Sequence, residues 1–240
     1  MMAAQVEERI WETEGERKRR AVQGLFTEIA PRYDLMNSVM SLSLHKRWRA
    51  FAVTQLGLKP GGRALDVCCG TGDFLPHLRK AIGPGGILLG VDFCEPMLAK
   101  ARAKSSSDLA MGDACRLPVQ SDSFDAVTVG WGMRNVPDID LAHAEVARVL
   151  KPGGTFASVD MARPRNPLMR KASGFLFNAV VPRLGALFGS GKAYTYLPKS
   201  TERFWDREEL AASMRRAGLV DVRYVDLFFG NICAHFGRKP

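Results

Sequence analysis

The sequence predicts an α/β fold: a mainly parallel, doubly wound sheet with an antiparallel hairpin at one edge. Two observations lead to this prediction. Between residues 63 and 160, short apolar segments alternate with amphipathic ones at the spacing of βαβ units. Two further apolar segments, 222–228 and 232–236, flank Gly230-Asn231, which is typical of a tight turn. Because βαβ crossovers are right-handed, the helices are expected to cover both faces of the sheet.

The length and composition are those of a globular protein with one large domain or one core with an added subdomain. The chain has 240 residues, of which 46% are hydrophobic and 25% charged, and this excludes disordered and low-complexity chains. We expect four parts: an N-terminal helical region (1–58), an α/β core (59–160), an inserted helical region (161–205) and a C-terminal helix with edge strands (206–240). The N-terminal and inserted helical regions are expected to form a lid.

Each element has its own local signal, taken in chain order. Apolar residues recur at helical spacing up to Ile29, where Ala30-Pro31 ends the first helical stretch, and a second helix is expected over 44–56. The expected strands of the core are short apolar runs, and the helices between them begin after Gly-rich turns. The strands are expected at 63–69, 87–92, 109–111, 124–130 and 155–160, and the helices at about 73–82, 95–104 and 139–150, with a turn at 151–154. After Asp160 the chain is expected to be mostly helical to about Gly189, with a further helix over 207–217 before the edge strands.

Several classes of protein are not expected. No apolar stretch reaches the roughly 18–20 residues that span a bilayer, and the acidic start, with Glu7, Glu8 and Glu12, is unlike a signal peptide. The five cysteines are an odd number without Cys-x-x-Cys spacing, so neither a disulfide framework nor a metal site is expected. Their number and spacing instead favour a cytoplasmic location.

The positive charge is concentrated in the C-terminal third. The net charge is +9, and residues 161–240 carry 14 basic and 6 acidic side chains. A basic face attracts nucleic acid or an anionic membrane surface. Since aromatic residues are not interleaved with the basic ones, and no nucleic-acid-binding module is evident, we expect no nucleic acid partner.

The turn after the first predicted strand favours a nucleoside cofactor without phosphates. It has the sequence Gly70-Thr71-Gly72, but Leu75 stands where a dinucleotide fingerprint has its third glycine, and the Gly-Lys-Ser/Thr of a phosphate loop is absent. Asp92 closes the second strand, where a carboxylate can accept hydrogen bonds from both hydroxyls of a ribose. Asp113 follows the third strand, where its carboxylate can accept a hydrogen bond from the amino group of an adenine. Together these residues predict S-adenosylmethionine as the cofactor.

The sequence resembles the class I S-adenosylmethionine-dependent methyltransferases. More narrowly, it is similar over about residues 20 to 240 to the ubiquinone/menaquinone biosynthesis C-methyltransferases, the demethylmenaquinone methyltransferase group. Four blocks carry the narrow match. They are Tyr33-Asp34-Leu35-Met36-Asn37 with Ser41, His45 and Trp48; Gly132-Met133-Arg134-Asn135-Val136; Arg148 to Gly154; and Tyr194-x-Tyr196-Leu197 with Ser200.

The resemblance implies a Rossmann-like fold and transfer of a methyl group to a ring carbon of a prenylated quinol, above all demethylmenaquinol. A benzoquinol of the ubiquinone pathway, a phytyl-naphthoquinol, or an RNA or small-metabolite acceptor are the alternatives. Gly70 and Thr71 would line the cofactor, Asp92 would hold the ribose, and Asp113 with Ala114 would flank the adenine. Cys68 departs from the general pattern, in which a glycine stands at that position.

Three polar residues in the family-specific blocks are candidates for catalysis. Arg134 stays charged and is expected to stabilise the quinolate oxygen. Tyr33 is expected to bind the quinol oxygen or relay its proton, and His45 has an ordinary pKa suited to a general base. Asp160 is a weaker candidate base. Each has a structural alternative: a lid anchor for Tyr33, a core histidine for His45, a salt-bridge partner for Arg134 and a turn cap for Asp160.

An apolar segment of the inserted region is expected to hold the prenyl tail, with Arg170, Lys171 and Arg183 nearby. Its residues are Phe175, Leu176, Phe177, Val180, Val181, Leu184, Leu187 and Phe188. With the basic C-terminal third, it predicts peripheral docking on the inner face of the cytoplasmic membrane. Packing of these residues onto the sheet is the alternative. The oligomeric state is left open, a homo-oligomer included.

Overall fold

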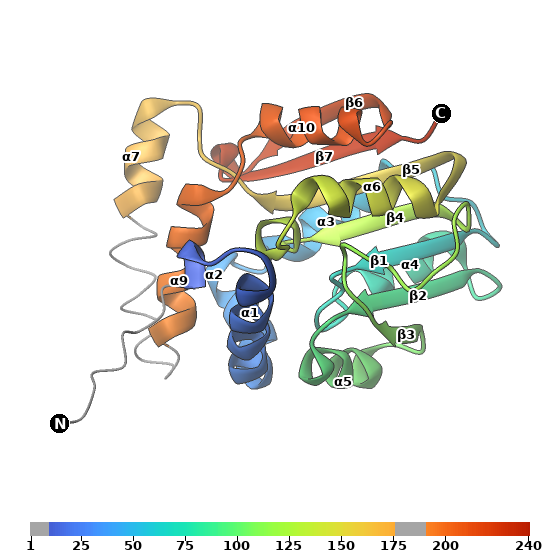
Figure 1. Cartoon of the computed structure of the whole chain (residues 1–240), viewed down its shortest axis with the longest axis horizontal. Helices are drawn as coiled ribbons and strands as arrows, with labels where there is room; N and C mark the ends of the chain where they lie inside the picture. The colour runs from blue at the N-terminus through green and yellow to red at the C-terminus, as the bar shows by residue number, and fades with distance from the viewer. Residues whose placement is uncertain (1–9, 176–190) are drawn as a thin grey trace.

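The computed structural model describes residues 10–175 and 191–240, and Figure 1 shows how their helices and strands are arranged. The elements alternate as predicted through the centre of the chain. In chain order they are η1 (Ile10–Glu12), α1 (Gly15–Ile29), η2 (Ala30–Arg32), α2 (Tyr33–Met40), α3 (Leu44–Thr54), β1 (Arg63–Val67), α4 (Leu75–Ile82), β2 (Ile87–Asp92), α5 (Glu95–Lys104), β3 (Asp108–Met111), β4 (Phe124–Gly130), η3 (Met133–Asn135), α6 (Ile139–Val149), β5 (Leu150–Met161), α7 (Pro167–Phe175), α9 (Gly191–Arg203), α10 (Arg207–Arg216), β6 (Val220–Leu227), η5 (Phe228–Gly230) and β7 (Ile232–Arg238).

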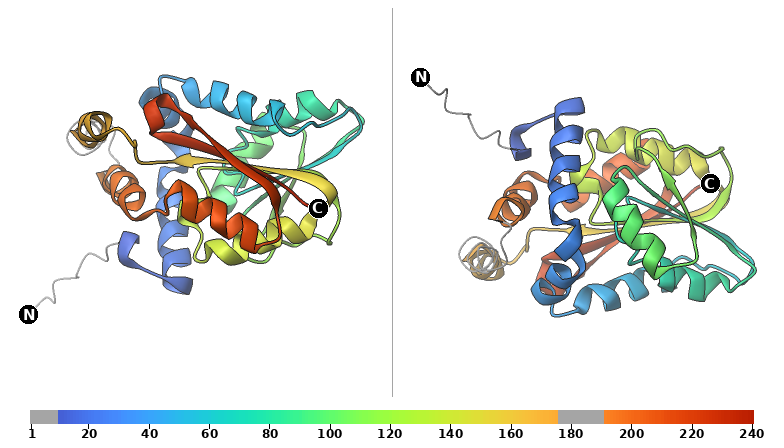
Figure 2. Two further views of the ribbon diagram at one scale, coloured as in Figure 1. Left: turned by 90° about the horizontal axis from the view of Figure 1, so that it is seen from above. Right: turned by 90° about the horizontal axis from the view of Figure 1, so that it is seen from below.

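The strands form one seven-stranded sheet in the order β3-β2-β1-β4-β5-β7-β6. The first five are parallel, and β7 runs antiparallel to both β5 and β6. Figure 2 shows the sheet edge-on, with α3 and α4 on one face and α6 and α10 on the other. The predicted doubly wound parallel sheet with an antiparallel edge pair is confirmed.

The central strands are apolar on both sides because both faces are covered by helices. On β1, Leu65 and Val67 belong to the core under α6 and α10, and Ala64 belongs to the core under α3 and α4. The same alternation holds for β4, where Val127 and Ala126 point into opposite cores. Two hydrophobic layers therefore hold the sheet rigid beneath the ends of its strands.

Two local predictions differ from the structure. The turn expected at 151–154 is instead the irregular start of β5, where the pairing with β4 shifts register between Phe124 and Ala126. The C-terminus stabilises it, because Gly153 and Gly154 exchange backbone hydrogen bonds with Lys239. A further helix, α2, follows Pro31, since proline sits in the first turn of η2, where its missing N–H costs nothing.

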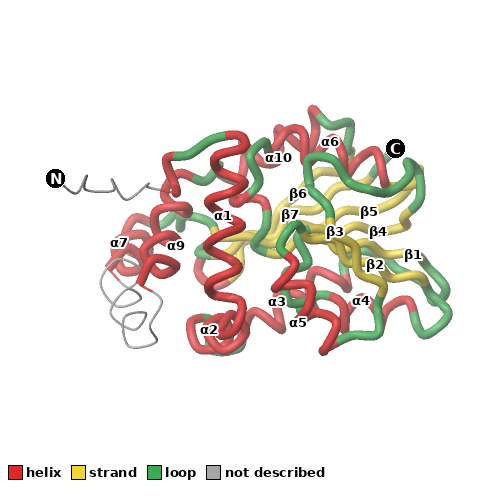
Figure 3. Tube along the Cα trace, turned by 60° about the horizontal axis from the view of Figure 1, so that its bottom comes forward, coloured by secondary structure: helices red, strands yellow, loops and turns green. Residues whose placement is uncertain are grey.

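Helix α1 lies across the loops that follow β2, β3 and β4. Gln23 donates to the backbone oxygen of Phe93 at 3.0 Å, and Lys18 donates to that of Val136 at 2.7 Å. Lys100 of α5 donates to the backbone oxygen of Pro31 at 3.0 Å. The N-terminal helices thus cover the carboxyl end of the sheet, where Figure 3 shows α1 crossing in front of it.

The division of the chain into four parts remains a prediction. The inserted region contains α7 and α9, and residues 176–190 lie outside the described part of the chain. The apolar residues predicted for the prenyl tail fall there, except Phe175, which is exposed on α7. Within the described residues, no helix combines the length and the hydropathy needed to cross a bilayer.

Candidate active site

Two adjoining cavities lie at the carboxyl end of the sheet, beneath the N-terminal helices. The first encloses about 630 Å³, including the part open to solvent, and is lined by the ends of β1, β2 and β4 and by α1. The second encloses about 980 Å³ between α1, α2, α3, α9 and η5. Phe26, Tyr33 and Trp131 line both cavities. The wall between the cavities is therefore aromatic.

Asp92 lies in the middle of the first cavity, at the end of β2. One carboxylate oxygen accepts from the backbone N–H of Gly70 at 2.8 Å and the other from that of Cys94 at 2.9 Å. Burial nonetheless raises the pKa of Asp92 to about 6. Gly70 adopts φ +55°, a left-handed conformation that favours glycine and turns its N–H toward this carboxylate. The predicted pair of Gly70 and Asp92 is thus brought together.

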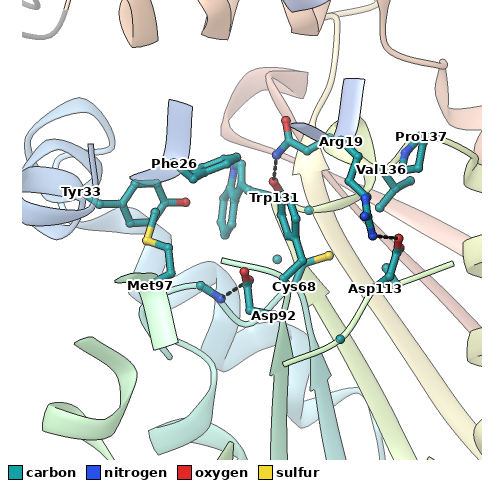
Figure 4. Close-up of a pocket in the computed structure, with 17 residues that line it drawn as sticks. Arg19, Phe26, Tyr33, Cys68, Asp92, Met97, Asp113, Trp131, Val136 and Pro137 are labelled. Carbon is teal, nitrogen blue, oxygen red and sulfur yellow. Dashed lines mark hydrogen bonds and ion pairs between the residues drawn. The ribbon is translucent and has the colours of Figure 1, made fainter. Parts of the chain in front are cut away.

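Asp113 and Ala114 line the far end of the first cavity. Asp113 accepts from the backbone N–H of Cys115 at 2.8 Å, and its other oxygen lies 3.4 Å from Arg19 of α1. Figure 4 shows this ion pair opposite Phe26 and Tyr33, with Asp92 and Cys68 between the two ends. The cavity therefore has an acidic end beside β3, an acidic centre and an aromatic end.

Thr71 is not among the residues that line the first cavity. It is buried, and its hydroxyl donates to Asp34 of α2 at 2.5 Å. Lys104 of α5 lies 2.6 Å from the same carboxylate of Asp34 and 3.1 Å from that of Asp73. Thr71 therefore joins the glycine turn to the helix that covers it.

Cys68 lines the first cavity with a left-handed backbone, at φ +54°. The non-glycine residue costs about 1–3 kcal/mol in this conformation. Gly132 faces it closely: a Cβ built at Gly132 would lie 2.6 Å from the Cβ of Cys68. The turn after β1 and the turn after β4 thus meet with no room for a side chain at Gly132.

The first cavity fits S-adenosylmethionine. Its carboxylates suit ribose hydroxyls and an adenine amino group, and they disfavour phosphates. The faces of Phe26, Tyr33 and Trp131 suit a sulfonium cation, because aromatic rings carry negative charge on their faces. With adenine at the Asp113 end and ribose at Asp92, the reactive methyl group would face the aromatic wall.

The second cavity contains a buried ion pair at one end. Arg134 of η3 donates to the carboxylate of Asp160 at 2.5 Å and to the backbone oxygen of Trp131 at 3.0 Å. Burial opposes the charge of Arg134, but Asp160 together with Tyr196 and Tyr33 outweighs burial and raises the pKa of Arg134. The Nε of Arg134 is buried without a hydrogen-bond partner. Arg134 is therefore a fixed cation in a cavity lined largely by apolar side chains.

His45 lies at the other end of the second cavity, in a network with Arg49. Since arginine only donates, the 2.6 Å contact from Nη1 of Arg49 makes Nδ1 of His45 an acceptor. The Nε2 of His45 then carries the proton and faces the hydroxyl of Ser38 at 3.4 Å. Burial, with the Arg49 cation, lowers the pKa of His45 to about 4. Asp73 completes the network, 3.5 Å from Arg49.

Tyr33 stands in the wall between the cavities. Burial raises the pKa of its phenol above the usual value, and its ring packs edge-on against Phe26 with centroids 5.9 Å apart. The three predicted catalytic residues, Tyr33, His45 and Arg134, thus all line the second cavity. Of the predicted cofactor residues, all but Thr71 line the first.

Among the lining residues that the sequence did not single out are Arg19, Arg49 and Trp131. Trp131 had a signal, since it stands between two glycines at a strand end. Arg49 stacks on it, with its guanidinium carbon 4.5 Å from the ring centroid. Arg19 and Arg49 lie on helices among many charged residues, and no local pattern distinguishes them.

Comparisons with known proteins give the family of the chain. The model of the ubiE/COQ5 methyltransferase family matches residues 13–239. A demethylmenaquinone methyltransferase of Desulfitobacterium hafniense is 41% identical, over 98% of this chain and 96% of that protein. A demethylmenaquinone methyltransferase of Staphylococcus aureus is also 41% identical, over 91% of this chain and 92% of that protein.

Solved structures share the fold at lower identity. An S-adenosylmethionine-dependent methyltransferase of Thermotoga maritima, described as a possible histamine N-methyltransferase, superposes with a TM-score of 0.67 at 22% identity and covers 91% of this chain and 99% of its own. A phosphoethanolamine N-methyltransferase of Haemonchus contortus in complex with S-adenosyl-L-methionine superposes with a TM-score of 0.59 at 18% identity. The match covers 81% of this chain and 52% of that one. The match of the family model and the near full-length identity confirm the resemblance drawn from the sequence: the chain belongs to the ubiE/COQ5 methyltransferase family and is an S-adenosylmethionine-dependent methyltransferase.

Proposed function

We propose that the protein methylates a ring carbon of a prenylated quinol, demethylmenaquinol, in menaquinone biosynthesis. One observation carries this proposal beyond the family relationship: a cavity that fits the methyl donor shares an aromatic wall with a larger, mostly apolar cavity that holds a fixed cation. An aromatic diol with an apolar tail matches the second cavity in both respects. Phe26, Tyr33 and Trp131 would hold the acceptor ring beside the methyl group.

When bound, S-adenosylmethionine supplies an electrophilic methyl group. The residues of the chain make the ring carbon nucleophilic and orient it. The quinol hydroxyl first releases its proton to water, and the bond from the methyl group to the sulfonium sulfur breaks as the new C–C bond forms. Arg134 stays protonated, so we propose that it stabilises the negative charge of the quinolate oxygen. Its Nε provides a donor that no protein group uses. As the new C–C bond forms, the ring C–H proton must leave.

A third cavity gives that proton a route to water. It is open, encloses about 1190 Å³ and is lined mainly by polar side chains near the start of α1 and on α9. Arg134 and Tyr196 line both this cavity and the second one. We propose that the proton leaves through water at this junction and that Tyr33, in the aromatic wall, binds the second quinol oxygen.

His45 is not placed as a general base. Its Nδ1 lone pair is taken by Arg49, its Nε2 carries a proton, and a pKa of about 4 makes it too weak to take a proton from a quinol. We propose instead that His45 positions Arg49 beneath Trp131. Asp160 is likewise held by Arg134, so we do not assign it a base role.

The expected activity is tested with a labelled methyl donor. Demethylmenaquinol and the benzoquinol precursor of ubiquinone are offered side by side, in detergent, to the purified protein. We expect label in the naphthoquinol product, with kcat/KM at least tenfold above that for the benzoquinol. Equal rates on both would broaden the acceptor class, and label in neither would refute the proposal.

Binding of S-adenosylmethionine is expected to weaken below pH 6. The ribose hydroxyls donate to ionised Asp92, whose pKa burial raises to about 6, so binding favours the deprotonated form. Affinity should therefore be constant above pH 7 and fall about tenfold per pH unit below 6, because a proton must then be released on binding. Isothermal titration calorimetry from pH 5 to 8 measures this slope.

The control for this slope is Asp92→Asn. The amide keeps the shape and one acceptor but does not titrate, so its affinity should be low and independent of pH over the same range. A slope that persists in Asp92→Asn would assign the titration to another group. An affinity in the unmodified protein that is flat down to pH 5 would contradict the role of Asp92.

A further inference from the structure

The outer side of α2 presents a row of exposed apolar side chains. Leu35, Val39 and Leu42 are 57%, 45% and 78% exposed. Leu35 and Val39 are four residues apart, which places them on one side of α2, and Leu42 lies in the turn that follows the helix. Met36 and Met40, on the inner side, line the second cavity. The helix is thus apolar both toward the cavity and toward solvent.

The turn between β6 and β7 presents another exposed apolar side chain at the same end of the cavity. Phe229 is 76% exposed. Its neighbour Phe228 lines the second cavity and packs on Trp48 of α3, with ring centroids 5.6 Å apart. Figure 2 shows this turn beside α2 and α3. The two turns therefore flank the same part of the cavity wall.

Both turns hold bulky residues in left-handed backbone conformations. The φ angles are +50° for Leu42, +46° for Phe228 and +56° for Phe229. Leucine and phenylalanine rarely adopt this region, and such strain clusters at functional sites. The fold therefore holds apolar side chains at the tips of two turns at a cost in strain, and it leaves Leu42 and Phe229 exposed.

The charges around these turns are basic. Lys46 and Arg47 are exposed on the first turn of α3, directly after the strained turn. The nearby acids are ion-paired: Asp34 with Lys104 at 2.6 Å, and Asp226 with Arg207. Among the described residues, no acidic side chain forms an ion pair with Lys46 or Arg47. Apolar tips beside such cations are the combination that binds at the interface of an anionic bilayer.

We propose that this docking surface, formed by Leu35, Val39, Leu42, Phe229, Lys46 and Arg47, binds anionic lipid membranes. The inference rests on the proposed function, because a quinol with a prenyl tail is held in a bilayer. Docking here would set the wall of the substrate cavity against the lipid. Projecting turn tips suit insertion among headgroups better than a flat protein interface does. Apart from Phe229, this surface lies outside the basic C-terminal third suggested by the sequence.

The test is co-sedimentation of the full chain with vesicles of three parts phosphatidylcholine and one part phosphatidylglycerol. We compare the unmodified protein with Leu42→Asp/Phe229→Asp. Aspartate adopts positive φ more readily than leucine or phenylalanine, so the turns should persist and the unfolding temperature should not fall. Binding should weaken at least about tenfold, since two apolar side chains no longer leave water and two negative charges are added.

Leu141→Asp is the matched control, since Leu141 is 48% exposed on α6, away from both turns. It should sediment like the unmodified protein. Lys46→Gln/Arg47→Gln should remove most of the difference between anionic and pure phosphatidylcholine vesicles. Unchanged binding of Leu42→Asp/Phe229→Asp, or equal weakening in Leu141→Asp, would overturn the proposed surface.

A second measurement separates this inference from the proposed function. Methyl transfer to a short-tailed demethylated naphthoquinol in detergent does not require a membrane, so Leu42→Asp/Phe229→Asp should retain the rate of the unmodified protein. The same variant should be slow on a long-tailed quinol in vesicles. Vesicle binding without methyl transfer would refute the function and leave the surface standing. Methyl transfer without vesicle binding would support the function and overturn the proposed docking surface.

Discussion

Gly132→Ala is expected to weaken binding of S-adenosylmethionine by about a hundredfold. The new Cβ would lie 2.6 Å from the Cβ and 3.0 Å from the sulfur of Cys68, closer than side chains approach. Cys68 lines the cofactor cavity, so the turn after β1 must move to make room. Overpacking of this kind costs about 1–3 kcal/mol, and the upper end corresponds to the stated loss. Calorimetric titration measures it.

The same geometry predicts that a second substitution rescues the first. Cys68→Gly removes the nearest clashing atoms and leaves only Cγ1 of Val129, the end of a side chain, at 3.0 Å. Glycine also adopts φ +54° without strain. Cys68→Gly/Gly132→Ala should therefore bind the cofactor within a few-fold of the unmodified protein. Gly85→Ala is the control, because nothing lies within 4 Å of a Cβ there. A double variant no better than Gly132→Ala would show that the clash is not the cause.

The fold could be predicted from the sequence because the central strands are buried on both faces. Burial on both sides leaves continuous apolar runs, and Gly-rich turns separate them. The start of β5 could not be predicted, since Lys151 to Gly154 form strand only through pairing with the C-terminal segment. Helix α2 was missed for a related reason: Pro31 ends one helix and begins the next turn.

The lining of the first cavity could be predicted where position along a strand decides which side chains reach it. Asp92 and Asp113 follow strand ends, and parallel strands place such ends together. Thr71 differs, because its hydroxyl binds Asp34, a residue of a helix that packs over the turn. A contact between segments so far apart in the chain leaves no local signal.

For the second cavity, the sequence predicted which polar residues line it better than it predicted their protonation and contacts. Tyr33, His45 and Arg134 do line one cavity, but the state of His45 depends on Arg49. Sequence assigns His45 its ordinary pKa, whereas burial and the 2.6 Å contact with Arg49 lower the pKa to about 4. Trp131 and Arg49 acquire their importance only by stacking on one another across the cavity wall.

Arg134→Ala is expected to impair both folding and turnover. The side chains of Arg134 and Asp160 are almost fully buried and 2.5 Å apart, so removing the arginine leaves an uncompensated buried carboxylate. Such a loss typically destabilises a protein by about 3–5 kcal/mol. If Arg134 also stabilises the quinolate, kcat should fall about 100- to 1000-fold. Chemical denaturation measures the first effect, and methyl transfer at saturating quinol the second.

A neutral double variant separates these two effects. Arg134→Met/Asp160→Asn removes both charges and keeps an acceptor for the backbone N–H of Met161, which now donates to Asp160 at 2.7 Å. Replacing a buried ion pair by a neutral pair is often close to neutral for stability, because neither charge is left without a partner. The double variant should thus regain most of the stability lost in Arg134→Ala.

Turnover should not return with stability. A methionine offers no positive charge to the quinolate oxygen, so kcat should stay as low in the double variant as in Arg134→Ala. Cofactor affinity should match that of the unmodified protein in both, because neither Arg134 nor Asp160 lines the first cavity. If the double variant recovers stability and kcat together, Arg134 acts only as a partner of Asp160. The charge that stabilises the quinolate must then come from elsewhere in the second cavity. Arg49 is the remaining buried cation among the described residues that line it.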